Sequence, residues 1–140
     1  MEKYNFADIA ILVIGDIMLD QYLWGSVERI SPEAPVPVVN IKQTSFAPGG
    51  GANVANNIAS LGAEVLLLGV VGDDYNGSHL KSVLSQNSIK HILFDVDMPT
   101  ITKVRIVGNK QQMIRLDYEQ PIILSDEIKN RIKSELIKCI

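Results

Sequence analysis

Two aspartates follow the first long apolar run of the chain. The run is Ile9–Gly15, and Asp16 and Asp20 lie just beyond it. Such a run is typical of a buried parallel strand, so we expect both aspartates at its carboxyl end, where open α/β sheets bind ligands. Carboxylate oxygens accept hydrogen bonds, which suits a ligand rich in hydroxyls. Aspartates that only end the strand or cap a turn would leave the same pattern, so both interpretations stay open.

A glycine-rich segment with the sequence PGGGAN occupies residues 48–53 and opens a predicted helix over Ala52–Leu61. Glycine lets the backbone approach a ligand closely, and the first amides of a helix donate hydrogen bonds to oxygen atoms. Gly50, Gly51 and Asn53 are therefore candidate ligand-binding residues. A plain glycine loop is the alternative.

Two familiar phosphate-binding motifs do not fit this segment. A dinucleotide fingerprint beginning at Gly49 needs glycine or alanine where Val54 stands, and it should follow the first buried strand directly. A P-loop needs Gly-Lys followed by serine or threonine, a sequence that the chain lacks. No cysteine, histidine or carboxylate cluster has metal-ligand spacing, so we predict no metal ligand.

Three basic residues form a second candidate site. Lys103 and Arg105 alternate along one face of a predicted strand, and Arg115 follows in the next. Positive charges across a hairpin would suit a phosphate or sugar hydroxyls. A solvated sheet edge whose charges discourage aggregation is the alternative interpretation.

Strands and helices that alternate along the chain must position these residues. Apolar runs predict further strands at Val65–Val71 and His91–Asp95, and helical spacing predicts a second helix over Asp74–Gln86. The pattern indicates an α/β fold. Residues Tyr22–Phe46 and Thr100–Leu116 interrupt it with β segments, which we expect to form a separate β layer, with a hairpin turn at Gly108-Asn109.

The C-terminal segment has the pattern of an amphipathic helix. Ser125 is a candidate N-cap, and apolar residues then recur every four positions, at Ile128, Ile132, Leu136 and Ile140. The stripe has no stop signal at its end. We therefore expect the fold to be truncated on its C-terminal side.

Composition narrows the class of protein. The 140 residues have a formal net charge of -3, which disfavours nucleic-acid binding, and a single cysteine, Cys139, which excludes an intrachain disulfide. The longest apolar runs are too short to span a membrane, and the N-terminus lacks the features of a signal peptide. We expect a cytoplasmic protein.

Taken together, these segments resemble the ribokinase (PfkB-type) family of carbohydrate kinases. The resemblance rests on Gly15-Asp16, on residues 50–53 and on the two β segments. Three longer motifs are similar to the branch that phosphorylates a heptose 7-phosphate: residues 15–20 (GDIMLD), 29–38 (RISPEAPVPV) and 111–117 (QQMIRLD). The resemblance implies a doubly wound, mainly parallel sheet with a small β lid over about 22–46 and 100–117, these 140 residues being its N-terminal part.

The resemblance also implies an activity. ATP, accompanied by Mg²⁺, would phosphorylate the anomeric hydroxyl of D-glycero-D-manno-heptose 7-phosphate. The product is the 1,7-bisphosphate, which leads to ADP-heptose and lipopolysaccharide core. The family's aspartate base in a Gly-x-Gly-Asp segment is missing, so we expect it beyond Ile140 and predict no catalytic residue and little activity in this chain alone.

By the same resemblance, the sugar or its phosphate would contact Asp16, Asp20, Gly50, Gly51, Asn53, Lys103, Arg105, Arg115 and Arg29. Arg29 would reach the site from the lid, in one interpretation from a partner subunit of a homodimer formed through that lid. A non-catalytic module that binds sugar phosphates or dimerises, and a kinase for another sugar, are the alternatives.

Overall fold

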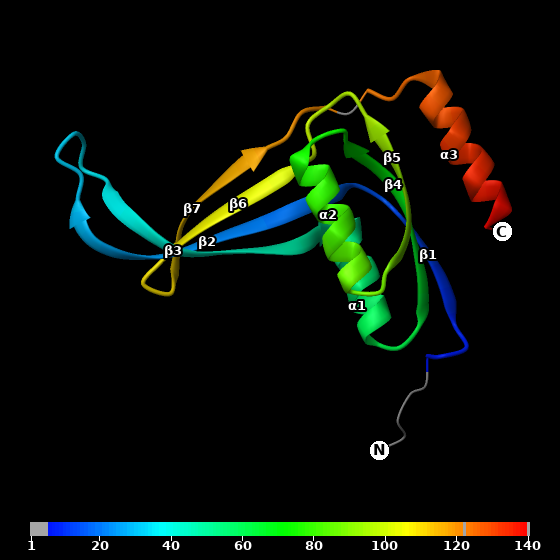
Figure 1. The fold of residues 1–140 in the computed structure, drawn as a ribbon, viewed down its shortest axis with the longest axis horizontal. Helices are drawn as coiled ribbons and strands as arrows, with labels where there is room; N and C mark the ends of the chain where they lie inside the picture. Colours follow the sequence, from blue (N-terminus) through cyan, green and yellow to red (C-terminus); the bar gives the residue numbers. More distant parts are fainter. Residues whose placement is uncertain (1–5, 122, 140) are drawn as a thin grey trace, which may run out of the picture.

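The computed structural model describes residues 6–121 and 123–139, which form two sheets and three helices (Figure 1). The strands are β1 (Ala10–Ile14), β2 (Ile17–Ile30), β3 (Pro37–Gly50), β4 (Glu64–Gly72), β5 (Lys90–Val96), β6 (Thr102–Gly108) and β7 (Gln111–Tyr118). The helices are α1 (Gly51–Ser60), α2 (Tyr75–Gln86) and α3 (Asp126–Lys138). The apolar runs predicted β1, β4 and β5, and the helical spacings predicted α1 and α2, to within a few residues at each end.

A three-stranded parallel sheet with the order β1-β4-β5 contains the predicted buried strands. Its two crossovers contain α1 and α2, which lie on the same side of the sheet (Figure 1). Alternate residues of β4, such as Val65 and Leu67, face these helices and join Leu80 and Leu84 of α2 in the core. Burial of each such leucine contributes about 2 kcal/mol, which holds the carboxyl ends of the strands in place.

A four-stranded mixed sheet with the order β3-β2-β6-β7 extends away from this core (Figure 1). The strand β2 is antiparallel to β3 and parallel to β6, and β6 is antiparallel to β7. The expected separate β layer is therefore present. Its first pair is longer than predicted, since β2 and β3 run from Ile17 to Gly50 rather than from Tyr22 to Phe46.

The turn between β6 and β7 lies one residue beyond its predicted place. Gly108 still belongs to β6, and the two turn residues are Asn109 and Lys110, with φ of 50° and 68°. Two positive φ angles match the twist of a tight hairpin, and asparagine adopts that conformation more readily than most residues. The Asn109 side chain also bonds both backbone groups of Val27, which attaches the turn to β2.

The helix α3 lies on the opposite side of the three-stranded sheet from α1 and α2 (Figure 1). Ser125 caps it as predicted, accepting a hydrogen bond from the Ile128 amide at 3.3 Å. The Arg131 guanidinium lies 4.9 Å from the centre of the Phe94 ring of β5. Ile132 and Leu136 of the apolar stripe are only half-buried, and Ile140 lies outside the described residues. Within the described ranges, no helix has the length and apolar character needed to cross a membrane.

Candidate functional site

The glycine segment packs directly against the backbone of Asp16. The Gly51 amide donates a hydrogen bond to the Asp16 carbonyl oxygen at 2.8 Å. Gly50 has a φ of 55°, and a Cβ atom there would lie 2.5 Å from the same oxygen. Both the positive φ and this close approach require glycine. The tertiary structure thus joins the first two sequence motifs, which are more than thirty residues apart.

The start of α1 presents backbone donors beside Asp16. Gly50 is the N-cap residue and has no side chain to accept hydrogen bonds from the first-turn amides. Asn53 is exposed in that first turn, as is Asp16 at the end of β1. Free amides at a helix start attract oxygen ligands, and the neighbouring carboxylate accepts hydrogen bonds from hydroxyls. This arrangement can hold a polyhydroxylated ligand from two sides.

Asp20 does not end the first strand as predicted. It is the fourth residue of β2, because the chain re-enters a strand directly after Asp16 and pairs with β3 and β6. Its carboxylate remains near the glycine segment, since a Cβ atom on Gly49 would lie 3.1 Å from the Asp20 Cγ. Asp20 therefore lies on a different strand from the one predicted, but beside the same glycine segment.

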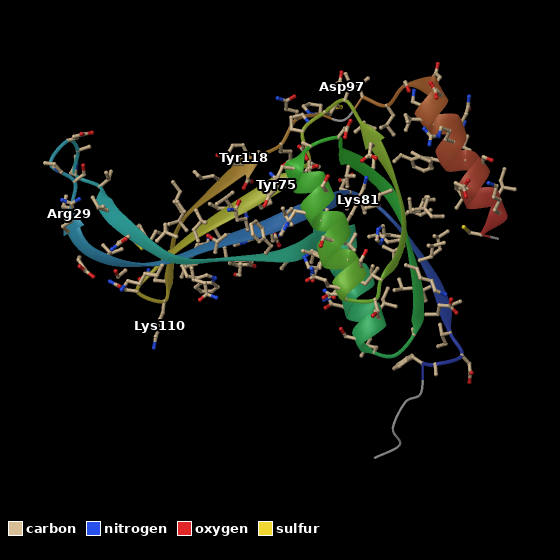
Figure 2. The ribbon with its side chains drawn as sticks, in the orientation of Figure 1. Arg29, Tyr75, Lys81, Asp97, Lys110 and Tyr118 are labelled. Atoms are coloured by element: carbon tan, nitrogen blue, oxygen red, sulfur yellow. The ribbon has the colours of Figure 1, made fainter. Side chains whose placement is uncertain are left out.

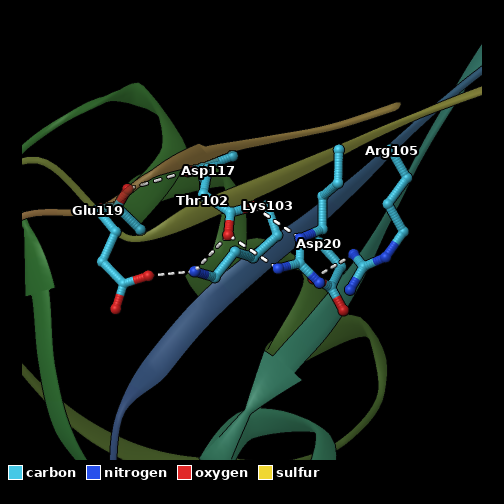
Figure 3. Close-up of polar contacts among 8 residues, drawn as sticks. Asp20, Thr102, Lys103, Arg105, Asp117 and Glu119 are labelled. Carbon is cyan, nitrogen blue, oxygen red and sulfur yellow. Dashed lines mark hydrogen bonds and ion pairs between the residues drawn. The ribbon is translucent and has the colours of Figure 1, made fainter. Parts of the chain in front are cut away.

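The three predicted basic residues are all paired with carboxylates. Figure 3 shows the pairs of Lys103 and Arg105. The Arg105 Nη1 donates to the Asp20 Oδ1 at 2.6 Å, and the guanidinium lies 5.2 Å from the centre of the Tyr22 ring. Donation of this hydrogen bond to Asp20 raises the pKa of Arg105 despite partial burial. Arg105 is therefore a fixed cation between a carboxylate and an aromatic ring.

Lys103 lies between two carboxylates. Its Nζ donates to Asp117 at 3.2 Å and makes a short contact with Glu119. Asp117 also accepts two hydrogen bonds from Arg115, at 2.8 and 3.1 Å, which contribute most to a lowered pKa of the Asp117 carboxyl. Contact with Glu119 is the main reason for the raised pKa of Lys103. All these groups lie on one face of the four-stranded sheet, which we call the polar face.

A pocket of about 360 Å³ connects the two groups of residues. Asp16, Ile101, Glu119, Gln120 and Pro121 line it. Because Glu119 contacts Lys103, the pocket has the Asp16 carboxylate on one wall and the charged pairs of the polar face at its edge. Of the residues predicted from the sequence, Asp16 lines the pocket itself, the glycine segment packs against Asp16, and Lys103 contacts the lining residue Glu119.

Arg29 is the predicted site residue that this chain does not bring to the pocket. It lies near the end of β2, at the tip of the four-stranded sheet far from α1 and α2 (Figure 2). There it lines a separate groove with residues of β3, among them Val38 and Asn40. Within one chain, Arg29 and Asp16 cannot contact the same small ligand.

Glu119 was not among the residues proposed from the sequence. It follows Arg115 and Asp117 at every second position, and in an extended chain such residues share a face. That alternation was a usable signal, although β7 ends at Tyr118. Its contact with Lys103 depends on the register of β6 against β7, which the predicted hairpin turn did not fix, since the turn lies one residue beyond its predicted place.

A second, larger pocket of about 510 Å³ is lined by four aspartates and lies at the ends of β4 and β5. Two of the four have protein partners: Asp74 accepts hydrogen bonds from Gly77 and Thr100, and Asp95 pairs with Lys81 at 2.5 Å. Across residues 6–121 and 123–139, no group of three or more histidine, cysteine or acidic side chains could hold a metal ion.

Comparison with known proteins identifies the family. Residues 8–122 match the pfkB family of carbohydrate kinases. The chain belongs to this family. This pfkB-family chain is 53% identical over 113 residues to the bifunctional protein HldE of Coxiella burnetii, covering 80% of the chain and 24% of that protein. It is 47% identical over 124 residues to the D-beta-D-heptose 7-phosphate kinase of Bordetella bronchiseptica, covering 86% of the chain and 40% of that protein. It therefore spans less than half the length of these relatives.

Solved structures of pfkB-type kinases share the fold. Phosphofructokinase-2 of Escherichia coli, in complex with fructose-6-phosphate, matches with a TM-score of 0.69 at 21% identity over 93% of this chain and 41% of that one. A carbohydrate kinase from Agrobacterium tumefaciens matches with a TM-score of 0.61 at 26% identity, over 78% of this chain and 35% of that one. The expected ribokinase-like α/β fold, present in part, is confirmed.

Proposed function

We propose that the protein containing this chain is a kinase that transfers the γ-phosphoryl group of ATP to the anomeric hydroxyl of D-glycero-D-manno-heptose 7-phosphate. The identity of about 50% to proteins named HldE and D-beta-D-heptose 7-phosphate kinase carries the proposal. Its product would be the 1,7-bisphosphate, a precursor of ADP-heptose for lipopolysaccharide core.

The site geometry supports different roles for the residues around Asp16 and for the basic residues of the polar face. Asp16 and the amides at the start of α1, with Gly50, Gly51 and Asn53, would bind the sugar hydroxyls. On the polar face, Lys103, Arg105 and Arg115 would bind the end of the substrate that bears the phosphate, with Asp20 holding Arg105 in place. Arg29, at the remote tip of the sheet, would contribute only from a partner subunit.

Membership of the pfkB family supports the use of ATP, with Mg²⁺ as its counterion. The described residues contain no cluster of carboxylates or histidines fit to hold Mg²⁺. We therefore assign no step that involves ATP or Mg²⁺ to the residues of this chain. The base that activates the anomeric hydroxyl would likewise come from the part of the kinase that this chain does not cover. We also propose a cytoplasmic homodimer formed through the four-stranded sheet.

A kinase assay on the full-length protein tests the proposal. With ATP and Mg²⁺, we expect a new anomeric phosphate signal in the ³¹P NMR spectrum from the heptose 7-phosphate and none from ribose. Turnover of fructose 6-phosphate in preference to the heptose would assign the protein to another substrate of the family. Binding of the heptose 7-phosphate without any turnover would favour a non-catalytic binding module.

A further inference from the structure

The polar face carries balanced charge around the pocket. Its three cations, Lys103, Arg105 and Arg115, meet three carboxylates, those of Asp20, Asp117 and Glu119. Every cation in this group has a carboxylate partner. A neutral group of this kind has little net attraction for an anion, so an incoming phosphate must first displace a carboxylate.

The three carboxylates differ in how firmly they are held. Asp20 and Asp117 belong to strands β2 and β7, and their side chains are 17% and 32% exposed. Asp117 also accepts two hydrogen bonds from Arg115 in addition to the one from Lys103. Moving either would break strand-held, charge-assisted hydrogen bonds.

Glu119 is held least firmly. It lies just beyond the end of β7, its side chain is 54% exposed, and its only side-chain contact described here is the one with Lys103. Water can therefore solvate the carboxylate when it leaves, so that displacing Glu119 costs less than displacing Asp20 or Asp117. Lys103, by contrast, is only 14% exposed and stays beside the pocket.

We propose that Glu119 is a displaceable counterion of Lys103, and that the phosphate group of a sugar phosphate takes its place when the substrate binds. This inference rests on the proposed function. In this arrangement Glu119 keeps Lys103 charged and oriented while the pocket lacks an anion. An uncharged sugar has no group that can compete for Lys103, so the exchange favours phosphorylated sugars.

Calorimetric titrations of the full-length protein test this exchange, with inorganic phosphate and with the heptose 7-phosphate as separate ligands. Glu119→Gln removes the competing charge while retaining the size of the side chain, so we expect the Kd for both ligands to fall about 3- to 10-fold. Glu127→Gln is the matched control, because Glu127 is also an exposed glutamate but lies in α3. It should leave both Kd values unchanged.

The same Glu119→Gln change in a protein that lacks Lys103 tests whether Lys103 is the cation that binds the phosphate. In a Lys103→Gln protein, the Glu119→Gln change should no longer tighten phosphate binding. Unchanged or weaker phosphate binding by Glu119→Gln, or the same gain in the Lys103→Gln background, would overturn the proposal. NMR spectroscopy tests the exchange in the unmodified protein. Addition of phosphate should shift the ¹³C carboxyl resonance of Glu119, and a resonance that does not move would argue against displacement.

The two proposals fail in distinguishable ways. If the unmodified protein does not phosphorylate the heptose while Glu119→Gln still tightens inorganic phosphate binding, the substrate assignment is wrong and the counterion exchange stands. If the protein phosphorylates the heptose and Glu119→Gln does not tighten phosphate binding, the exchange is wrong and the kinase assignment stands.

Discussion

Asp16 occupies a position where the backbone and the side chain serve different purposes. Its carbonyl oxygen accepts the Gly51 amide and so fixes the glycine segment, while its exposed side chain lines the pocket. A substitution that shortens the side chain therefore leaves the packing of Gly50 and Gly51 in place. This separation makes Asp16 a suitable residue for a binding test.

We expect Asp16→Ala in the full-length kinase to raise the KM for the sugar about 10- to 100-fold, because charge-assisted hydrogen bonds to hydroxyls are lost. The thermal unfolding midpoint should stay within about 2 °C of the unmodified value. Steady-state kinetics at saturating ATP measure the first quantity. Asp8→Ala is the control, since Asp8 is exposed at the opposite end of β1, and an unchanged KM in Asp16→Ala would contradict the assignment.

At the scale of elements, one carboxylate joins three segments of the chain. Asp74 caps α2 by accepting the Gly77 amide at 2.7 Å, and it accepts both the amide and the hydroxyl of Thr100, at 2.8 and 2.7 Å. The Thr100 hydroxyl oxygen in turn accepts the Gly72 amide at 3.0 Å. The end of β4, the start of α2 and the connection into β6 thus depend on Asp74.

This cluster predicts a pH-dependent stability. Burial alone would raise the pKa of Asp74, but the hydrogen bonds from Thr100 and Gly77 outweigh it, so the pKa is lowered. A lowered pKa stabilises the fold above the unfolded-state value of about 3.9, and that stabilisation is lost as the pH falls through the lower folded-state value. Asp74→Ala should cost about 1–3 kcal/mol at pH 7, and the cost should shrink below about pH 4.

Urea unfolding of the 140-residue chain at several pH values measures this difference. Asp97→Ala is the matched control, because Asp97 is exposed on the loop after β5 (Figure 2) and should change little at any pH. A cost for Asp74→Ala that is the same at pH 3 and pH 7 would show that the charge of the carboxylate is not what stabilises the cluster.

Gly77 shows tertiary packing overriding helix propensity in α2. Alanine usually stabilises a helix by about 1 kcal/mol relative to glycine. Here an added Cβ would overlap the Gly72 carbonyl oxygen and lie 2.9 Å from the Thr100 hydroxyl, so Gly77→Ala should destabilise the chain by about 1–3 kcal/mol. The neighbouring exposed Ser78→Ala should be neutral or slightly stabilising in the same urea titration. Equal stability of Gly77→Ala and the unmodified chain would disprove the packing argument.

At the scale of the whole molecule, the four-stranded sheet leaves apolar side chains uncovered opposite its polar face. Ile114 and Leu116 of β7 are 51% and 38% exposed, and Ile114 pairs with Ile106 of β6. No helix in the described ranges packs on β7 closely enough to bury them. An exposed apolar row on an edge strand favours association with another copy of the sheet.

We therefore expect the 140-residue chain to self-associate and Ile114→Lys to weaken that association at least about 10-fold, because a lysine there would be desolvated in the interface. Sedimentation velocity over a range of concentrations measures it. Gln112→Lys is the control, as Gln112 is also exposed on β7 but pairs with Val107, which lies two residues after Arg105 on the polar face. A monodisperse monomer at high concentration would contradict the prediction.

Sequence alone determined most of the helices and strands of this protein and, at the pocket, Asp16. Continuous apolar runs predicted β1 and β4, and helical spacing predicted α1 and α2, because these patterns are local. The glycines of residues 48–53 predicted a close approach of the backbone to a neighbouring group for the same reason. The alternation of Lys103 and Arg105 predicted that both lie on one face of a strand. The tertiary structure decided the rest. Asp20 belongs to β2 and Arg29 lies remote from the pocket, because both depend on the pairing of β2 with distant segments, which no local pattern specifies. Glu119 contacts Lys103 because of the exact register of the β6–β7 hairpin, which the turn pattern alone did not fix.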